Sequence, residues 1–186
     1  MELYWMQEKQ TVAARQFRYL WLTVAILLLD QAIKMVVKAY LPLYESKPVI
    51  GSLVMFTHVQ NTGAAFSISL GSPSLNRVFF IIVPLLAIAF IFYLIYRSTT
   101  RLQQISFCMI IGGALGNLMD RLLYGYVTDF VDMDFPDFIM QRWPVFNLAD
   151  STIVIAMGLL ILDMIIHKPT PEITSPNHNE VSTLDQ

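Results

Sequence analysis

Four long apolar runs dominate this chain of 186 residues. Each run approaches the roughly 20 residues that an α-helix needs to cross a bilayer. We predict membrane helices over residues 19–39, 78–96, 105–123 and 145–166. The sequence is 55% hydrophobic and 14% charged, whereas a soluble domain carries roughly 25% charged residues. The sequence therefore predicts a mostly α fold, an integral membrane bundle of four transmembrane helices.

The positive charges that flank these runs predict an orientation. Lysine and arginine are enriched on the cytoplasmic side of membrane proteins. Such residues precede the first run, separate the second from the third, and follow the fourth: Lys9, Arg15, Arg18, Arg97, Arg101 and Lys168. We therefore expect both termini in the cytoplasm and the loops 41–76 and 124–144 outside.

The two ends of the chain differ from the apolar core. Residues 1–18 form a predicted cytoplasmic N-terminal extension. Residues 168–186 are polar and contain three prolines, a composition typical of disorder. We predict a disordered cytoplasmic tail there, and a membrane domain over residues 19–167.

The first outer loop does not resemble a plain linker. Its sequence "PVIGSLVMFTHVQNTGAAFSI" alternates β-branched and aromatic residues with turn formers. This pattern favours short strands. We expect a small β-sheet on the outer side of the membrane.

Polar residues inside the runs gather at similar depths. A helix rises about 1.5 Å per residue, so position in a run gives depth. Asp30 falls near mid-bilayer, and four further residues fall in the outer half: Asn117, Asp120, Asn147 and Asp150. Asp163 lies near the cytoplasmic end, where we expect it to snorkel to water. Intramembrane ionisable residues usually have functional roles, so the outer group is the candidate site.

Spacing suggests partners for some of these residues. Asp30 and Lys34 are four residues apart and can pair on one helical face. Asp120 adjoins Arg121, and a carboxylate beside an arginine is expected to be ionised and paired, which suits a supporting role. The glycines at 112, 113 and 116 allow close approach of helices in the membrane.

Asp129 and Asp150 are the remaining candidates. Taken singly, Asp150 is explained by the helix dipole, which favours an anion at a helix start, and Asp129 by a structural role in a loop. If they meet, their repulsion separates their pKa values, so that one keeps a proton while the other is ionised. Such a pair can activate water and polarise a carbonyl, which is peptide hydrolysis without a covalent intermediate.

Other classes of protein remain open from the residues alone. A proton-coupled transporter would also use intramembrane carboxylates, although here they cluster at one depth. A serine–lysine protease would need Ser67 with Lys34 or Lys38. A zinc protease is disfavoured because the sequence has no H-E-x-x-H motif. The net charge of -2 argues against a nucleic-acid partner, and Cys108 is expected to be a packed, inert thiol.

Five sequence blocks resemble those of the bacterial lipoprotein signal peptidases, also called type II signal peptidases. The resemblance covers about residues 20–166. The blocks are "DQAIK" at 30–34, "NTGAAFS" at 61–67, "GGALGNLMDR" at 112–121, "GYVTDF" at 125–130 and "FNLADS" at 146–151.

This resemblance implies an inner-membrane aspartic protease with Asp129 and Asp150 as its catalytic pair. It implies substrates that are prolipoproteins with a diacylglyceryl-modified cysteine, cleaved just before that cysteine at the periplasmic face, with no cofactor or metal. It also implies inhibition by globomycin-like cyclic peptides, contact with membrane lipids and a monomeric enzyme. The outer loop would form a sheet that cradles the substrate. The supporting positions that it implies are Asp30, Asn61, Gly63, Asn117, Asp120, Arg121, Asn147 and Ala149.

Overall fold

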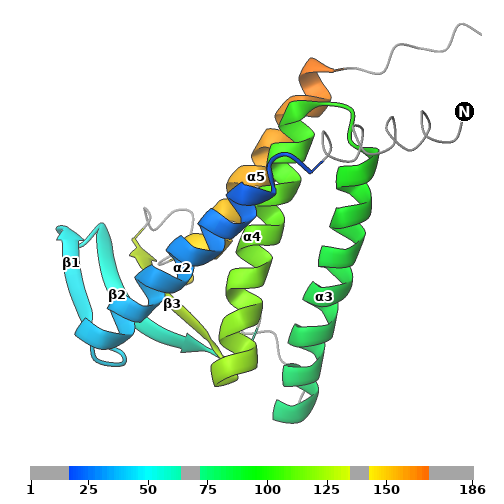
Figure 1. The fold of residues 1–186 in the computed structure, drawn as a ribbon. Coiled ribbons are helices and arrows are strands. Elements are labelled where there is room, and N and C mark those ends of the chain that lie inside the picture. Colours follow the sequence, from blue (N-terminus) through cyan, green and yellow to red (C-terminus); the bar gives the residue numbers. More distant parts are fainter. Residues whose placement is uncertain (1–16, 64–71, 135–142, 168–186) are drawn as a thin grey trace, which may run out of the picture.

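A computed structural model describes residues 17–63, 72–134 and 143–167. In these ranges the chain forms four long helices and a three-stranded sheet (Figure 1). The helices are α2 (Leu20–Tyr40), α3 (Pro73–Arg97), α4 (Arg101–Tyr124) and α5 (Leu148–Ile166). Most of the predicted N-terminal extension, the predicted tail, Ser67 and parts of both outer loops lie outside the described residues.

All four helices are long and apolar enough to cross a membrane. Large hydrophobic side chains cover their outward faces, for example Leu28 of α2, Leu86 of α3 and Met164 of α5. Such exposure is unusual for a helix in water but ordinary for one in lipid. The predicted multi-pass helical membrane bundle is therefore confirmed.

Helix α4 is the centre of the bundle and packs against α2, α3 and α5. Its glycines make this possible. A Cβ at Gly112 would lie 3.0 Å from Ile26 of α2, and one at Gly113 would lie 2.5 Å from the carbonyl oxygen of Ala149 in α5. Side chains at these positions would push the helices apart, so the predicted close approach is confirmed.

The sheet lies at the end of the bundle where α2 and α4 finish and α5 starts (Figure 1). Strands β1 (Ser46–Ile50), β2 (Val54–Asn61) and β3 (Val127–Met133) are antiparallel, in the order β1-β2-β3. The first two come from the predicted loop. The third strand comes from the second outer loop, for which the sequence predicts no strand. Strand β3 lacks the usual sequence signal because its side chains do not alternate between buried and exposed and two of them are aspartates.

A glycine turn directs the chain from α4 into β3. Gly125 has the left-handed conformation, with φ of 81°, and its N–H donates to the Arg121 carbonyl at 3.1 Å. This αL ending is a common way to satisfy the last carbonyls of a helix. As a result β3 begins only three residues after α4 ends, close to the polar residues of its last turns.

Helix α5 begins at Leu148, three residues later than predicted, because the chain before it is held in an extended form. Phe146 pairs with Val131 of β3 through hydrogen bonds of 2.7 and 3.0 Å. Asn147 then caps the helix. The fold thus joins the start of α5 directly to the strand that carries Asp129.

Candidate active site

Asp129 lies in the middle of β3, opposite Val59 of β2, and is only 2% exposed. Its Oδ1 accepts a 2.6 Å hydrogen bond from the side-chain amide of Asn147. Its Oδ2 accepts one of 3.0 Å from the amide of Asn61, at the end of β2. The sheet therefore delivers this carboxylate to the helix bundle and provides one of its two donors.

Asp150 lies in the first turn of α5 and forms a capping box with Asn147. The N–H of Asn147 donates to Asp150 Oδ2 at 3.1 Å, and the N–H of Asp150 donates to Asn147 Oδ1 at 3.0 Å. This exchange satisfies two backbone donors that a helix start otherwise leaves unpaired. The other oxygen, Oδ1, accepts a 2.8 Å hydrogen bond from Asn117 of α4.

Two asparagines join these carboxylates. Asn147 contacts both aspartates, and its side-chain amide also donates to Asn117 Oδ1 at 3.0 Å. Asn147 is fully buried, and buried amides with every hydrogen bond satisfied fix a single arrangement. The carboxylate of Asp129 on β3 and that of Asp150 on α5 are thereby held in one site.

The surroundings of Asp129 change its acidity. Burial, which disfavours the charged form, raises the pKa of Asp129 to about 7. The hydrogen bond from Asn61 opposes this shift, and the negative charge of Asp150 adds to it. With this pKa, Asp129 carries a proton in part of the molecules near neutral pH and is able to donate it.

A buried ammonium lies directly behind the pair. Lys34 of α2 is 0% exposed and lies 2.9 Å from Asp30 Oδ2, 3.3 Å from Asp120 Oδ2 and 2.9 Å from Asn117 Oδ1. The predicted pairing of Asp30 with Lys34 is confirmed. Asp120, in contrast, pairs with this lysine and accepts the N–H of Thr128 at 2.9 Å, so the prediction of an Asp120–Arg121 pair is wrong.

Arg121 points elsewhere because neighbouring residues on a helix face in different directions. Its guanidinium donates to the carbonyl of Gly63 at 3.2 Å and lies 5.2 Å from the centre of the Phe80 ring of α3. The N–H of Gly63 in turn donates to Asn61 Oδ1 at 3.0 Å. Arg121 thus ties the segment after β2 to α4, and this segment holds the donor to Asp129.

Asp30 links α2 to the start of α5. Its Oδ1 accepts the N–H of Ala149 at 3.1 Å, and its Oδ2 accepts the amide of Gln31 at 3.2 Å. A Cβ at Gly116 would lie 2.5 Å from Asp30 Oδ2 and 3.4 Å from the Ala149 side chain. Asp30 and Ala149 are therefore packing and anchoring residues beneath the pair.

Asp163 does not snorkel to water as predicted. It is 1% exposed and accepts hydrogen bonds from Thr100 Oγ1 and Gln103 Nε2, both at 2.7 Å. It also lies 3.1 Å from His167 Nδ1. These partners satisfy the carboxylate inside the protein. Asp163 belongs to the last turns of α5, and this helix ends on the side of the bundle away from the sheet (Figure 1).

All ten predicted site residues fall in this one region of the structure. Lys34 was predicted as the partner of Asp30 but was not counted among the site residues, although an ionisable side chain in an apolar run is a signal of a functional position. Cys108 is buried, as expected. Within the described ranges, no group of three or more histidine, cysteine, aspartate or glutamate residues is arranged to hold a metal ion.

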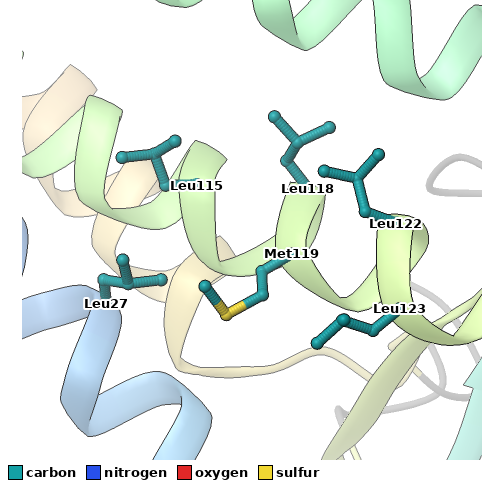
Figure 2. Close-up of a pocket in the computed structure, with 6 residues that line it drawn as sticks. All are labelled: Leu27, Leu115, Leu118, Met119, Leu122 and Leu123. Carbon is teal, nitrogen blue, oxygen red and sulfur yellow. The ribbon is translucent and has the colours of Figure 1, made fainter.

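An apolar pocket of about 270 Å³ lies between α2 and α4. Figure 2 shows Leu27 of α2 with five side chains of α4, and no polar side chain is among them. The lining residues are Leu27, Leu115, Leu118, Met119, Leu122 and Leu123. None of the predicted site residues lines this pocket.

Comparison with known proteins agrees with this geometry. A family model described as signal peptidase (SPase) II matches residues 22–166. A lipoprotein signal peptidase of Halothermothrix orenii is 44% identical over 140 residues, which are 74% of this chain and 88% of that protein. One of Photorhabdus laumondii is 39% identical over 154 residues, which are 82% of this chain and 90% of that protein.

The fold also matches solved structures. One described as a bacterial membrane enzyme has a TM-score of 0.70 and 27% identity, over 83% of this chain and 92% of that one. A second with the same description has a TM-score of 0.67 and 30% identity, over 80% of this chain and 91% of that one.

Proposed function

Since the chain belongs to the signal peptidase II family, we propose that Asp129 and Asp150 are its catalytic carboxylates. Membership gives the activity: the chain is a membrane aspartic protease that cleaves signal peptides from prolipoproteins. A transport activity is not supported by these similarities. The observation that carries the proposal is that one buried side chain, Asn147, contacts both aspartates.

The pair can hydrolyse a peptide bond by general acid–base chemistry. Asp150 accepts a proton from water as the water oxygen bonds to the scissile carbonyl carbon. Asp129 donates its proton to the carbonyl oxygen, which forms a neutral diol. When the diol collapses, the C–N bond breaks, the leaving nitrogen takes the proton from Asp150, and Asp129 recovers one from the diol hydroxyl.

The remaining polar residues hold this pair in position. Asn61, Asn117 and Asn147 donate to the two carboxylates. Gly63 and Arg121 fasten the segment that carries Asn61. Asp30, Asp120 and Ala149 join α2, α4 and the start of α5 beneath them.

The proposed substrate is a prolipoprotein whose cysteine carries a diacylglyceryl group, cleaved just before that cysteine. A lipid anchor in the bilayer fixes the depth of the scissile bond, which turns binding into orientation and can lower the barrier by several kcal/mol. Support for this comes from the sheet, which adjoins the pair at one end of the bundle and can lie along an extended peptide.

The proposed setting is the bacterial inner membrane, with the pair toward the periplasm and both termini in the cytoplasm. The positive residues that flank α3 and α4, Arg97 and Arg101, support this orientation. So does the arrangement in Figure 1, where α2 begins and α5 ends at the end away from the sheet. Residues 19–167 would form the peptidase domain between cytoplasmic extensions 1–18 and 168–186. We further propose that the chain acts as a monomer and binds globomycin-like cyclic peptides.

The test is cleavage of a diacylglyceryl-modified precursor by purified Asp129→Asn and Asp150→Asn variants. Each should lower kcat by roughly a thousandfold or more. When two residues act as one catalytic unit, removing either one costs about as much as removing both. Asp134→Asn, which changes a carboxylate just after β3, is the matched control and should remain active. Retained cleavage in either of the first two variants would refute the assignment. An unmodified precursor cleaved at the same rate would refute the lipid requirement.

A further inference from the structure

The direction of an asparagine amide depends on its partners. One end of the group accepts hydrogen bonds and the other donates them, and the two ends have nearly the same shape. Asn117 and Asn147 both contact the catalytic carboxylates. A carboxylate in its ionised form can accept hydrogen bonds but cannot donate them. A reversed amide would therefore present an oxygen to a carboxylate and repel it.

Lys34 removes this ambiguity at Asn117. An ammonium has three N–H donors and no acceptor, so the atom that faces Lys34 Nζ at 2.9 Å must be the oxygen of Asn117. The nitrogen of Asn117 then faces Asp150 Oδ1, at 2.8 Å.

The same oxygen determines the direction of the second amide. Oδ1 of Asn117 also accepts the nitrogen of Asn147 at 3.0 Å. That nitrogen donates in addition to Asp129 Oδ1 at 2.6 Å, while the oxygen of Asn147 accepts the N–H of Asp150 at 3.0 Å. Lys34 therefore fixes the direction of Asn117 directly. Through the oxygen of Asn117 it favours the same direction of Asn147 that the backbone N–H of Asp150 also requires.

We propose that Lys34 is a positioning residue for the reaction: it orients the amide of Asn117 so that its nitrogen faces Asp150, and through Asn117 it supports the direction of Asn147 that presents a donor to Asp129. This inference rests on the proposed roles of Asp129 and Asp150. Lys34 itself is completely buried and acts through the asparagines.

Charge balance alone does not explain the arrangement. Asp30 and Asp120 use two of the three N–H groups of Lys34, and Asn117 uses the third. Lys38, one turn further along α2, provides a comparison. It lies 4.0 Å from Asp120 Oδ1 and 3.7 Å from the centre of the Tyr124 ring. Among the described residues, it forms no hydrogen bond with either asparagine.

Lys34 also contributes to the electrostatics of Asp129. The charged groups around Asp129 are Asp150 of α5, Lys34 of α2 and Arg121 of α4. The positive charge of Lys34 favours the ionised form and so lowers the pKa of Asp129. Its removal should raise that pKa and move the alkaline limit of activity to higher pH.

Two substitutions of Lys34 separate the effect of its N–H donor from the effect of its positive charge. Their side chains are similar to each other in length. Lys34→Met removes both, whereas Lys34→Gln removes the charge and keeps an N–H that can reach Asn117. With a diacylglyceryl-modified precursor, Lys34→Met should lower kcat roughly a hundredfold, the size expected of a misplaced catalytic group, with little change in KM. Lys34→Gln should recover much of that loss. Both should show the alkaline shift, and Lys38→Met should show neither effect.

The outcomes distinguish this inference from the proposed function. Wild-type kcat in Lys34→Met, with Asp129→Asn inactive, would overturn the role of Lys34 and leave the catalytic pair in place. Equal losses of kcat in the Met and Gln variants would show that Lys34 has only a structural role and would overturn the inference. An unchanged alkaline limit of activity would overturn it too. If Lys34→Met does not fold, the comparison is made in an Asp30→Asn background, where one buried negative charge is also absent. Failure of both Met variants to fold would likewise overturn the proposal, because Lys34 would then be needed for assembly.

Discussion

The amide of Asn147 donates a 2.6 Å hydrogen bond to Asp129 Oδ1, from the residue that caps the helix carrying the other aspartate. The helix cap and the contact with Asp129 use different atoms of the same side chain. The oxygen accepts the N–H of Asp150, and the nitrogen reaches Asp129. Helix initiation and assembly of the pair are therefore coupled, and mutation can separate them.

Replacing Asn147 by serine or alanine should achieve this separation. Serine caps helices about as well as asparagine, whereas alanine costs typically about 1 kcal/mol. Asn147→Ser should therefore unfold close to the wild-type temperature, and Asn147→Ala should be less stable by about 1 kcal/mol. Neither can donate to Asp129 as the amide does, so both should lower kcat. Thermal unfolding and cleavage assays on the same samples test this, and full activity in the serine variant would contradict it.

The pH dependence of cleavage should report on Asp129. Its raised pKa, about 7, means that the proton needed for acid catalysis is present below that pH and lost above it. Activity should therefore decline as the pH rises through about 7. Asn61 donates to Asp129 Oδ2 and lowers this pKa, so Asn61→Ala should move the decline to higher pH. A kcat profile from pH 5 to 9 measures both, and a shift to lower pH would contradict the assigned contact.

Hydropathy and charge were sufficient to predict the helices of this bundle, because a bilayer requires long apolar segments whatever the tertiary contacts. The starts of three helices were less accurate: α3 begins at Pro73 and α4 at Arg101, five and four residues earlier than predicted, and α5 begins three residues later. Val145 and Phe146 are as apolar as the helix that follows, and only the pairing of Phe146 with β3 keeps them extended. A pairing between distant segments leaves no mark in local hydropathy.

The partners of the buried charges were predictable only in part. Asp30 and Lys34 are one helical turn apart, and spacing was enough to pair them. Asp120 adjoins Arg121 in the sequence, yet its cation comes from α2, because tertiary packing and not sequence proximity decides which side chains meet. The pairing of Asp129 with Asp150 rested on family resemblance, since nothing local in either segment specifies the other.

Gly116 should be sensitive to the smallest substitution. A Cβ there would lie 2.5 Å from Asp30 Oδ2, and Asp30 cannot move without breaking its bonds to Lys34 and Ala149. Gly116→Ala should therefore lower both stability, by roughly 1–3 kcal/mol as overpacking typically does, and kcat. Gly158→Ala in α5 is the matched control, because a Cβ there meets nothing within 4 Å. Equal behaviour of the two variants in thermal unfolding would rule out the close contact.

Asp163 should matter for stability and not for catalysis. Its oxygens accept from Thr100 and Gln103, which join the start of α4 to the end of α5. Asp163→Ala leaves these donors without an acceptor, and hydrogen bonds to a charged group are worth about 1.5–3 kcal/mol each. The unfolding temperature should therefore fall markedly. Cleavage per folded molecule should stay near the wild-type rate, because the site lies at the other end of the bundle.

His167→Ala is the control for this cluster. His167 is 54% exposed and lies 3.1 Å from Asp163, and even a charged contact at such an exposed side chain contributes only about 0–1 kcal/mol. Its removal should change the unfolding temperature little, since Thr100 and Gln103 still satisfy the carboxylate. A large fall in kcat for folded Asp163→Ala, measured with the diacylglyceryl-modified precursor, would show that the two ends of the bundle are coupled and would contradict a purely stabilising role.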